Sequence, residues 1–184
     1  SHPFGFNQKK HDLHVHRRWD RRGIRPHKRM ERALCKTLSM DAPMQDFSLD
    51  SFNHQRAQIV IDSLYQSGVE HFAIAPGSRS TPLTLAIAEH MKARSEIHFD
   101  ERGLGYFALG LAKAIKKPVG VVVTTATAAA NLMPAVMEAH LSRIPLILLL
   151  ADRPPELRDC GANQTADQIK LFSSMTRWEI DLAF

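Results

Sequence analysis

The sequence Ser-Glu-Ile-His-Phe-Asp-Glu-Arg-Gly-Leu-Gly at residues 95–105 places two acids directly after a short apolar segment. An apolar pattern of helical spacing follows, at Leu104, Phe107, Leu111 and Ile115. The stretch therefore predicts a buried strand that leads into a helix whose first turn carries Asp100 and Glu101. Ligands of open α/β sheets collect at the carboxyl ends of the strands, so the two acids mark a candidate site. Acids in a first helical turn also commonly do no more than complement the helix dipole, and spacing alone favours that interpretation.

The alternation of strand and helix continues on both sides of this stretch. Helices are predicted at residues 55–66, 81–93, 102–116, 128–141 and 165–172. Strands are predicted at 69–75, 96–99, 118–125 and 145–151, with a last strand at 177–182. The run at 118–125 is continuously apolar, as in strands that are covered on both faces. Strands separated by helices of about 10–15 residues indicate βαβ units, so we expect an α/β fold with a parallel sheet and helices on both faces.

The charge of the chain is unevenly distributed. Its formal net charge is +5, but residues 1–40 hold 11 Lys/Arg against 3 Asp/Glu, and residues 41–184 hold 13 against 16. The globular part is thus mildly acidic, which argues against nucleic acid as its ligand. The apolar runs are too short for a membrane span, and the two cysteines form neither a zinc pattern nor a disulfide framework. We therefore expect no nucleic-acid partner, no membrane association and a cytoplasmic location.

Residues 1–44 are predicted to be a disordered basic tail or extension, and residues 45–184 one domain. The tail has few aliphatic residues, so it cannot bury enough apolar surface to offset the entropy of ordering it. Its functional interpretations are a nucleic-acid or nuclear-localisation arm, a metal site at His11, His14 and His16, and a transit peptide, which fits poorly because Ser and Thr are scarce. We prefer a dispensable extension with the working start at Met40 or Met44.

In a parallel sheet the carboxyl ends of all strands open on one edge, which here gathers four polar segments: 77–80, 100–101, 124–127 and 152–164. The first, Pro76-Gly77-Ser78-Arg79-Ser80-Thr81, offers amides, hydroxyls and an Arg before a helix, which suits a carboxylate or a phosphate. An ordinary turn is an equally good interpretation. The phosphate-binding pattern GxxxxGK[ST] and the dinucleotide pattern GxGxxG are both absent from the sequence.

The last polar segment places Arg153 just past a buried strand, with a backbone stiffened by two prolines. Asn163 and Gln164 add amides that can donate and accept hydrogen bonds. This set suits a small molecule that carries carboxylates and hydroxyls. The structural alternative is a capped loop in which Arg153 and Glu156 form a solvated ion pair. We expect Cys160 to be a buried and inert thiol.

Taken together, these stretches resemble one family, the thiamine-diphosphate-dependent 2-succinyl-5-enolpyruvyl-6-hydroxy-3-cyclohexene-1-carboxylate synthases of menaquinone biosynthesis. The matching stretches are Ile74-Ala75-Pro76-Gly77-Ser78-Arg79-Ser80-Thr81-Pro82-Leu83, Phe99-Asp100-Glu101-Arg102-Gly103-Leu104-Gly105, Ala130-Asn131-Leu132 with Pro134-Ala135-Val136, and Ala151-Asp152-Arg153-Pro154-Pro155-Glu156-Leu157 continuing to Asp159-Cys160-Gly161-Ala162-Asn163-Gln164. The resemblance runs from about residue 53 to the end of the sequence and covers only the family's N-terminal, pyrimidine-binding domain.

The resemblance implies a domain that works as part of a longer enzyme. The family's diphosphate-binding domain carries a Gly-Asp-Gly…Asn motif that holds Mg²⁺ or Mn²⁺, and this motif is absent from the sequence. We therefore expect a fragment that is inactive alone and contains no metal ligands of its own. The full-length form is expected to be a homodimer or homotetramer.

The resemblance also implies roles for individual residues. Glu101 is the expected catalytic residue, which would hydrogen-bond N1′ of the cofactor's aminopyrimidine and favour its 4′-imino tautomer, and a desolvated Glu suits this role. The expected substrate-binding residues are Ser78, Arg79, Arg153, Asn163 and Gln164. The implied reaction decarboxylates 2-oxoglutarate and adds the resulting succinyl carbanion to isochorismate, with the cofactor as electron sink.

The expected cofactor-binding loop contains one departure from the family. The sequence Thr125-Ala126-Thr127-Ala128 stands where the family usually has Thr-Ser-Gly-Thr-Ala, so an Ala replaces the Gly. Ala adds a methyl group and penalises positive φ, so that either the loop shifts slightly or the affinity for the cofactor suffers. Two alternatives to the synthase stay open: an isolated non-catalytic α/β module or remnant, and a different carboligase of the same cofactor class.

Overall fold

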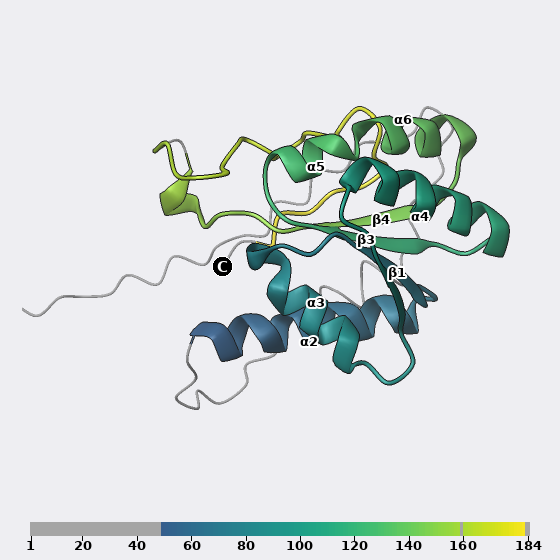
Figure 1. Ribbon diagram of the computed structural model, residues 1–184, viewed down its shortest axis with the longest axis horizontal. Coiled ribbons are helices and arrows are strands. Elements are labelled where there is room, and N and C mark those ends of the chain that lie inside the picture. The colour runs from purple at the N-terminus through teal and green to yellow at the C-terminus, as the bar shows by residue number, and fades with distance from the viewer. Residues whose placement is uncertain (1–48, 159, 183–184) are drawn as a thin grey trace, which may run out of the picture.

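The computed structural model describes residues 49–158 and 160–182, which form a layered α/β domain (Figure 1). Its sheet consists of β1 (His71–Ile74), β2 (Arg94–Ile97), β3 (Val119–Val123) and β4 (Leu146–Leu150). The strand order is β2-β1-β3-β4, and every neighbouring pair is parallel. The predicted fold class is thereby confirmed. The predictions for residues 1–44, including the His11, His14 and His16 site, lie outside the described residues.

Helices cover both faces of the sheet. In Figure 1, α2 (Leu49–Gln66) and α3 (Thr81–Glu89) lie below it, whereas α4 (Glu101–Ile115), α5 (Thr127–Asn131) and α6 (Met133–Ser142) lie above it. Two short 3-10 turns, η1 (Ser78–Ser80) and η2 (Pro155–Leu157), follow β1 and β4. No helix within the described part of the chain is long and apolar enough to cross a membrane.

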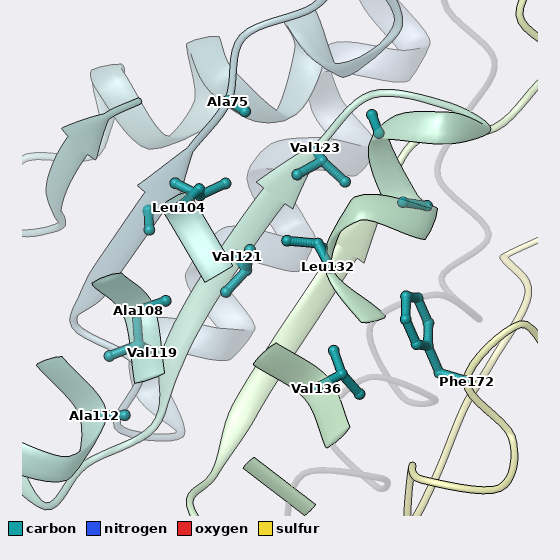
Figure 2. Close-up of a cluster of buried hydrophobic side chains, with 13 residues drawn as sticks. Ala75, Leu104, Ala108, Ala112, Val119, Val121, Val123, Leu132, Val136 and Phe172 are labelled. Carbon is teal, nitrogen blue, oxygen red and sulfur yellow. The ribbon is translucent and has the colours of Figure 1, made fainter. Parts of the chain in front are cut away.

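The central strand β3 explains the continuous apolar run in the sequence, because both of its faces are buried. Val121 contributes to the core beneath α4–α6, and the next residue, Val122, contributes to the core against α2 and α3. Phe172, from the segment after β4, is 4% exposed and joins the α4–α6 core. Figure 2 shows its ring beside α6, on the side where Val136 lies. The C-terminal segment is therefore part of the packing of this domain.

Several predicted boundaries are wrong for identifiable reasons. The first helix begins at Leu49 and not at residue 55, because no helix breaker lies between them. The helix predicted at 81–93 ends at Glu89, and the strand predicted at 96–99 comes two residues earlier. The prediction that this strand is buried is also wrong, because β2 lies at the edge of the sheet and all four of its residues are exposed. The helix predicted at 128–141 is divided into α5 and α6, since Pro134 lacks the N–H that would continue the hydrogen-bond ladder.

The two elements predicted at the end of the chain are also wrong. Residues 165–172 contain turns in place of a helix, and Lys170 has a φ of 64°, which interrupts a right-handed helix. Residues 177–182 form no strand; Leu182 packs instead against the core between the sheet and α2/α3. Both segments are shaped by tertiary contacts that a local pattern does not contain.

The strand order fixes where a ligand can bind. The chain goes from β1 outward to β2 and then returns to the other side of β1 to form β3. Such a reversal opens a crevice outside the carboxyl ends of the two strands at the switch point, here β1 and β3. The loops after these strands approach each other closely, because a Cβ at Gly77 would lie 2.5 Å from Cβ of Thr124. Only glycine fits at position 77 in this arrangement.

Candidate active site

The two acids at the start of α4 have different surroundings. Asp100 is the N-cap: its carboxylate accepts hydrogen bonds from the backbone N–H groups of Arg102 and Gly103 at 2.9 and 3.3 Å. It also pairs with the Arg102 guanidinium at 2.7 Å. The Arg102 side chain, followed by the Gly103 amide, holds the pKa of Asp100 well below its usual range. The interpretation as a helix-terminal acid therefore holds for Asp100.

Glu101 is half-buried and turns toward α5. Its Oε2 accepts a hydrogen bond from Nδ2 of Asn131 at 3.2 Å. Asn131 is the last residue of α5, directly before the interruption that Pro134 imposes on the helix. The amide fixes one oxygen of the carboxylate and leaves the other without a partner among the described residues. A fixed carboxylate at the end of β2, with one oxygen available, can accept or transfer a proton on a bound molecule.

The loop after β1 closes on itself and exposes two of the predicted substrate residues. The Gly77 carbonyl accepts hydrogen bonds from the backbone N–H and the hydroxyl of Ser80, at 3.1 and 3.0 Å. Ser80 is fully buried, whereas Ser78 and Arg79 are exposed. Within residues 49–158 and 160–182 neither the Ser78 hydroxyl nor the Arg79 guanidinium has a hydrogen-bond or ion-pair partner.

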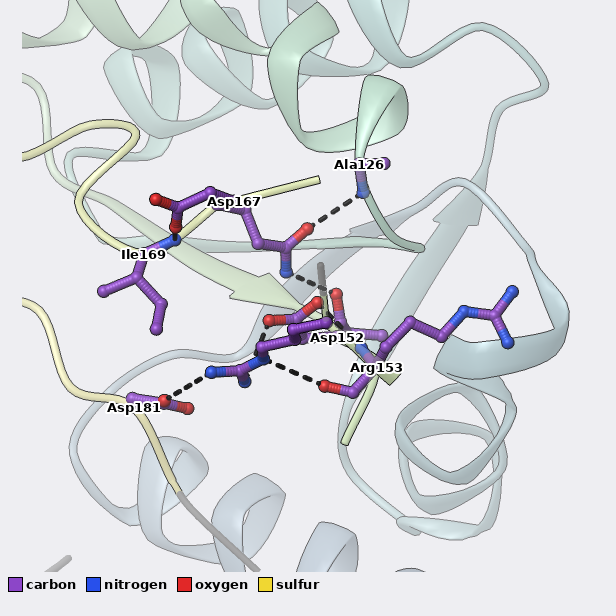
Figure 3. Close-up of polar contacts among 9 residues, drawn as sticks. Ala126, Asp152, Arg153, Asp167, Ile169 and Asp181 are labelled. Atoms are coloured by element: carbon purple, nitrogen blue, oxygen red, sulfur yellow. Dashed lines mark hydrogen bonds and ion pairs between the residues drawn. The ribbon is translucent and has the colours of Figure 1, made fainter. Parts of the chain in front are cut away.

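Arg153, in the loop after β4, is held by a hydrogen bond to Asn163 in the same segment. Nη2 of Arg153 donates to the Asn163 carbonyl at 2.7 Å, whereas its Nε is buried without a partner among the described residues. In Figure 3 this side chain extends away from Asp152 and Asp181. The ion pair between Arg153 and Glu156 that the structural alternative predicted is not formed; Asp152 instead pairs with Arg158 at 3.0 Å. That pair is mostly buried and fixes the backbone from which Arg153 projects.

Cys160, in the same loop, is exposed, so the prediction of a buried thiol is wrong. The cause is the surface position of the loop, which the sequence does not reveal. Its Sγ donates to the Leu157 carbonyl at 3.4 Å. In the described part of the chain no group of three His, Cys, Asp or Glu side chains could hold a metal ion.

The loop after β3 is buried and braced from the C-terminal segment. Thr125 is 1% exposed, and its Oγ1 donates to the Gln164 carbonyl at 2.8 Å. Nε2 of Gln164 donates in turn to the Thr125 carbonyl at 3.4 Å. The Ala126 N–H donates to Oε1 of Gln168 at 2.9 Å, whereas Thr127 is exposed. The hydroxyl and carbonyl of Thr125 and the N–H of Ala126 are thus already occupied within the domain.

Ala126 occupies the position where the family usually has glycine. The loop keeps the backbone that glycine favours, with φ 56° and ψ −113° at Ala126. These angles, with the Ala128 N–H donating to the Thr125 carbonyl at 3.3 Å, are those of the first central residue of a type II′ turn. Glycine is the usual residue there because any side chain is strained. Ala126 therefore has a backbone conformation that favours glycine, and it is strained there.

The structure places every predicted site residue at the carboxyl edge of the sheet and joins several of them. Direct contacts connect Thr125 with Gln164 and Arg153 with Asn163. Sequence reasoning missed the roles of Asn131 and Gln168. Asn131 stood inside a motif and could have been found as the polar residue of an otherwise apolar helix. Gln168 carried no signal, because the segment around it was predicted to be helical.

This arrangement agrees with the comparison to known families. The family described as thiamine pyrophosphate enzyme, N-terminal TPP binding domain, matches residues 54–171, which is well over half of the chain. The match begins in α2 and ends just before Phe172, so it includes all four strand-end loops. The chain therefore belongs to the thiamine pyrophosphate enzymes and contains their N-terminal cofactor-binding domain.

Proposed function

We propose that this domain serves a thiamine-diphosphate-dependent carboligase that decarboxylates 2-oxoglutarate and adds the resulting succinyl group to isochorismate. Bound thiamine diphosphate, with Mg²⁺ or Mn²⁺, would supply the electron sink for the decarboxylation. The observation that carries the proposal is the occurrence, at one sheet edge, of a fixed carboxylate and two arginines with available N–H groups. A cytoplasmic location belongs to the same proposal.

Glu101 is the residue that would contact the pyrimidine ring of the cofactor. A carboxyl group next to a ring nitrogen can hold or share a proton at that atom. Asn131 fixes Oε2, so the proton would be held at Oε1. The residues present therefore fit the aminopyrimidine, whereas the metal would need ligands from elsewhere.

The two arginines suit substrates with several carboxylates. The Arg79 guanidinium is exposed, and the buried Nε of Arg153 is a donor that an anionic oxygen would satisfy. Arginine binds a carboxylate through two parallel hydrogen bonds, which Lys cannot form. Both 2-oxoglutarate and isochorismate carry carboxylates. Ser78 beside Arg79, and Asn163 and Gln164 beside Arg153, would select hydroxyl and keto oxygens.

The test measures turnover in a protein in which this chain is joined to a diphosphate-binding domain. Glu101→Gln should lower turnover by about 10²–10⁴-fold. Its unfolding midpoint should not change, because the Gln oxygen still accepts the hydrogen bond from Asn131. Arg79→Lys and Arg153→Lys should lower kcat/KM for isochorismate, whereas Arg94→Lys, at the opposite edge of the sheet, should not.

Three outcomes would contradict this proposal in different ways. Near-normal turnover of Glu101→Gln removes the catalytic role of this residue. Turnover with pyruvate but not with 2-oxoglutarate and isochorismate indicates another carboligase. No binding of thiamine diphosphate and Mg²⁺ in calorimetry indicates a non-catalytic module.

We also propose that the enzyme is a homodimer or homotetramer in which a second copy covers the surface formed by β2 and the start of α4. Ile97, Phe99 and Tyr106 are exposed there, Phe99 to 92%. The rings of His98 and Phe107 stack at 4.4 Å and join the two elements. Phe99→Ser should shift the sedimentation velocity toward a smaller species, whereas Met91→Ser, an exposed apolar residue at the other end of β2, should not. Equal behaviour of the two variants would exclude this surface.

A further inference from the structure

Gln168 connects two strand-end loops through its side-chain amide. Its Oε1 accepts a hydrogen bond from the Ala126 N–H at 2.9 Å, and its Nε2 donates to the Ala151 carbonyl at 2.7 Å; both bonds are drawn as dashed lines in Figure 3. Ala126 follows β3 and Ala151 follows β4, and these strands are neighbours in the sheet. Because one bond needs an acceptor and the other a donor, a primary amide makes both, whereas a carboxylate makes only the first.

The backbone that presents this amide is fixed on both sides. The carboxylate of Asp167 accepts a hydrogen bond from the Ile169 N–H at 3.2 Å, and the Gln168 carbonyl accepts one from the Leu171 N–H at 3.1 Å. Phe172, four residues further on, is anchored in the core. The amide is therefore a rigid bridge between the two loops.

The bridge ends on Ala126, a strained residue of the site. A non-glycine residue outside the favoured regions costs about 1–3 kcal/mol and persists only where its surroundings over-determine it. Around Ala126 they do so at both peptide groups: Gln168 binds its N–H, and its carbonyl accepts from the Ala130 N–H at 3.1 Å. Removal of the Gln168 bond would leave a buried N–H without a partner and one constraint fewer on the turn.

We propose that Gln168 is a positioning residue, which holds the turn at Ala126 against the end of β4 and so sets the place of the cofactor-binding loop relative to Arg153. The inference rests on the proposed function, in that it gives the turn at Ala126 its role toward thiamine diphosphate. Gln168 would act through the Ala126 amide and the Ala151 carbonyl, to which its own side chain is bonded.

Amide hydrogen exchange of the ¹⁵N-labelled 184-residue chain tests the bridge without any ligand. Gln168→Met, which has a similar shape and no hydrogen bond, should raise the exchange rate of the Ala126 amide at least about 10-fold relative to the Ala128 amide, since hydrogen-bond loss removes the protection. Gln168→Glu keeps the acceptor and should preserve most of that protection. Gln58→Met, a matched glutamine on α2, should leave both amides unchanged. Equal exchange of Ala126 in the wild-type and Gln168→Met chains would overturn the proposal.

Titration of the same ¹⁵N-labelled variants with thiamine diphosphate and Mg²⁺, in the protein in which this chain is joined to a diphosphate-binding domain, tests the positioning role. The midpoint for the shift of the Thr127 amide signal should rise at least about 5-fold in Gln168→Met and less in Gln168→Glu, because only the former releases the turn. If Gln168→Met loses the protection of the Ala126 amide but keeps the wild-type midpoint for the cofactor, Gln168 has only a structural role and the proposal is refuted. If the wild-type joined protein shows no shift at millimolar cofactor, the proposed function fails, whereas the exchange data of the 184-residue chain still decide whether the bridge exists.

Discussion

Replacement of Ala126 by glycine should reveal the strain stored in the loop after β3. Ala126 has φ 56° and ψ −113°, a conformation that costs alanine about 1–3 kcal/mol. Glycine adopts these angles without that cost. Two losses oppose the gain: about 0.5–1 kcal/mol for the greater freedom of glycine in the unfolded chain, and about 0.8 kcal/mol for the buried methyl group, since Ala126 is 6% exposed. The net change of a single variant is therefore small and uninformative.

A matched variant isolates the strain. Ala128, two residues further on in α5, is equally buried, and its φ is not positive. Ala128→Gly therefore suffers both losses without relief and should destabilise by about 1.3–1.8 kcal/mol. The free energies of unfolding of the two variants should differ by about 1–3 kcal/mol, with Ala126→Gly the more stable.

Urea unfolding of the 184-residue chain measures this difference, provided that the slope of unfolding free energy against urea is the same in the three proteins. Equal destabilisation by the two substitutions would refute the reasoning, because it would mean that Ala126 carries no strain. If the strain at Ala126 also opposes the cofactor-bound form of the loop, Ala126→Gly should bind thiamine diphosphate more tightly as well.

Three further substitutions test other parts of the structure. Gly77→Ala places a Cβ 2.5 Å from Cβ of Thr124 and should destabilise by about 1–3 kcal/mol, and Thr124→Gly in the same chain should restore part of this loss in a double-mutant cycle of urea unfolding. Asp100→Ala should lower the unfolding temperature above about pH 4, the usual pKa of Asp. Because the Arg102 side chain lowers the pKa of Asp100 in the folded state, the difference in unfolding temperature from wild type should shrink as the pH falls through that lowered pKa. A difference that does not depend on pH would contradict this. Phe172→Ala should destabilise by about 3–5 kcal/mol in calorimetry, and a cost near zero would show that the C-terminal segment does not belong to the core.

The sequence was sufficient for the features that depend on repeated local patterns. The continuous apolar run around β3 predicted a doubly covered strand, and the alternation of strands and helices predicted the parallel sheet. From the parallel sheet alone it followed that the loops carrying Ser78, Glu101 and Arg153 share one edge. Each of these inferences needs only the period of the pattern and the direction of the chain.

The sequence was insufficient where long-range contacts override local preference. The segment 165–172 has a helical pattern, but Gln164 and Gln168 bond to the loop after β3, about 40 residues away in the chain, and left-handed residues at 164 and 170 break the helix. For the same reason Asn131 could not be predicted as the hydrogen-bond partner of Glu101. This contact depends on how α5 packs against α4, which the sequence pattern of neither helix contains.

The residues that orient the side chains of the candidate site are thus not the residues by which the site is identified. Glu101 and Arg153 are placed by the ends of strands, but the directions of their side chains depend on Asn131 and on the segment that ends in Gln168. A strained turn can be kept in such a framework because the bonds around it fix both of its peptide groups. It follows that a substitution at Gln168, whose side chain bonds only to backbone groups of motif residues, the Ala126 amide and the Ala151 carbonyl, should alter the loop more than a substitution at exposed Thr127, although Thr127 belongs to the motif. In this domain the motif residues Glu101 and Arg153 would supply the chemistry. The side-chain amides of Asn131 and Gln168 would determine whether these two residues point toward the same place.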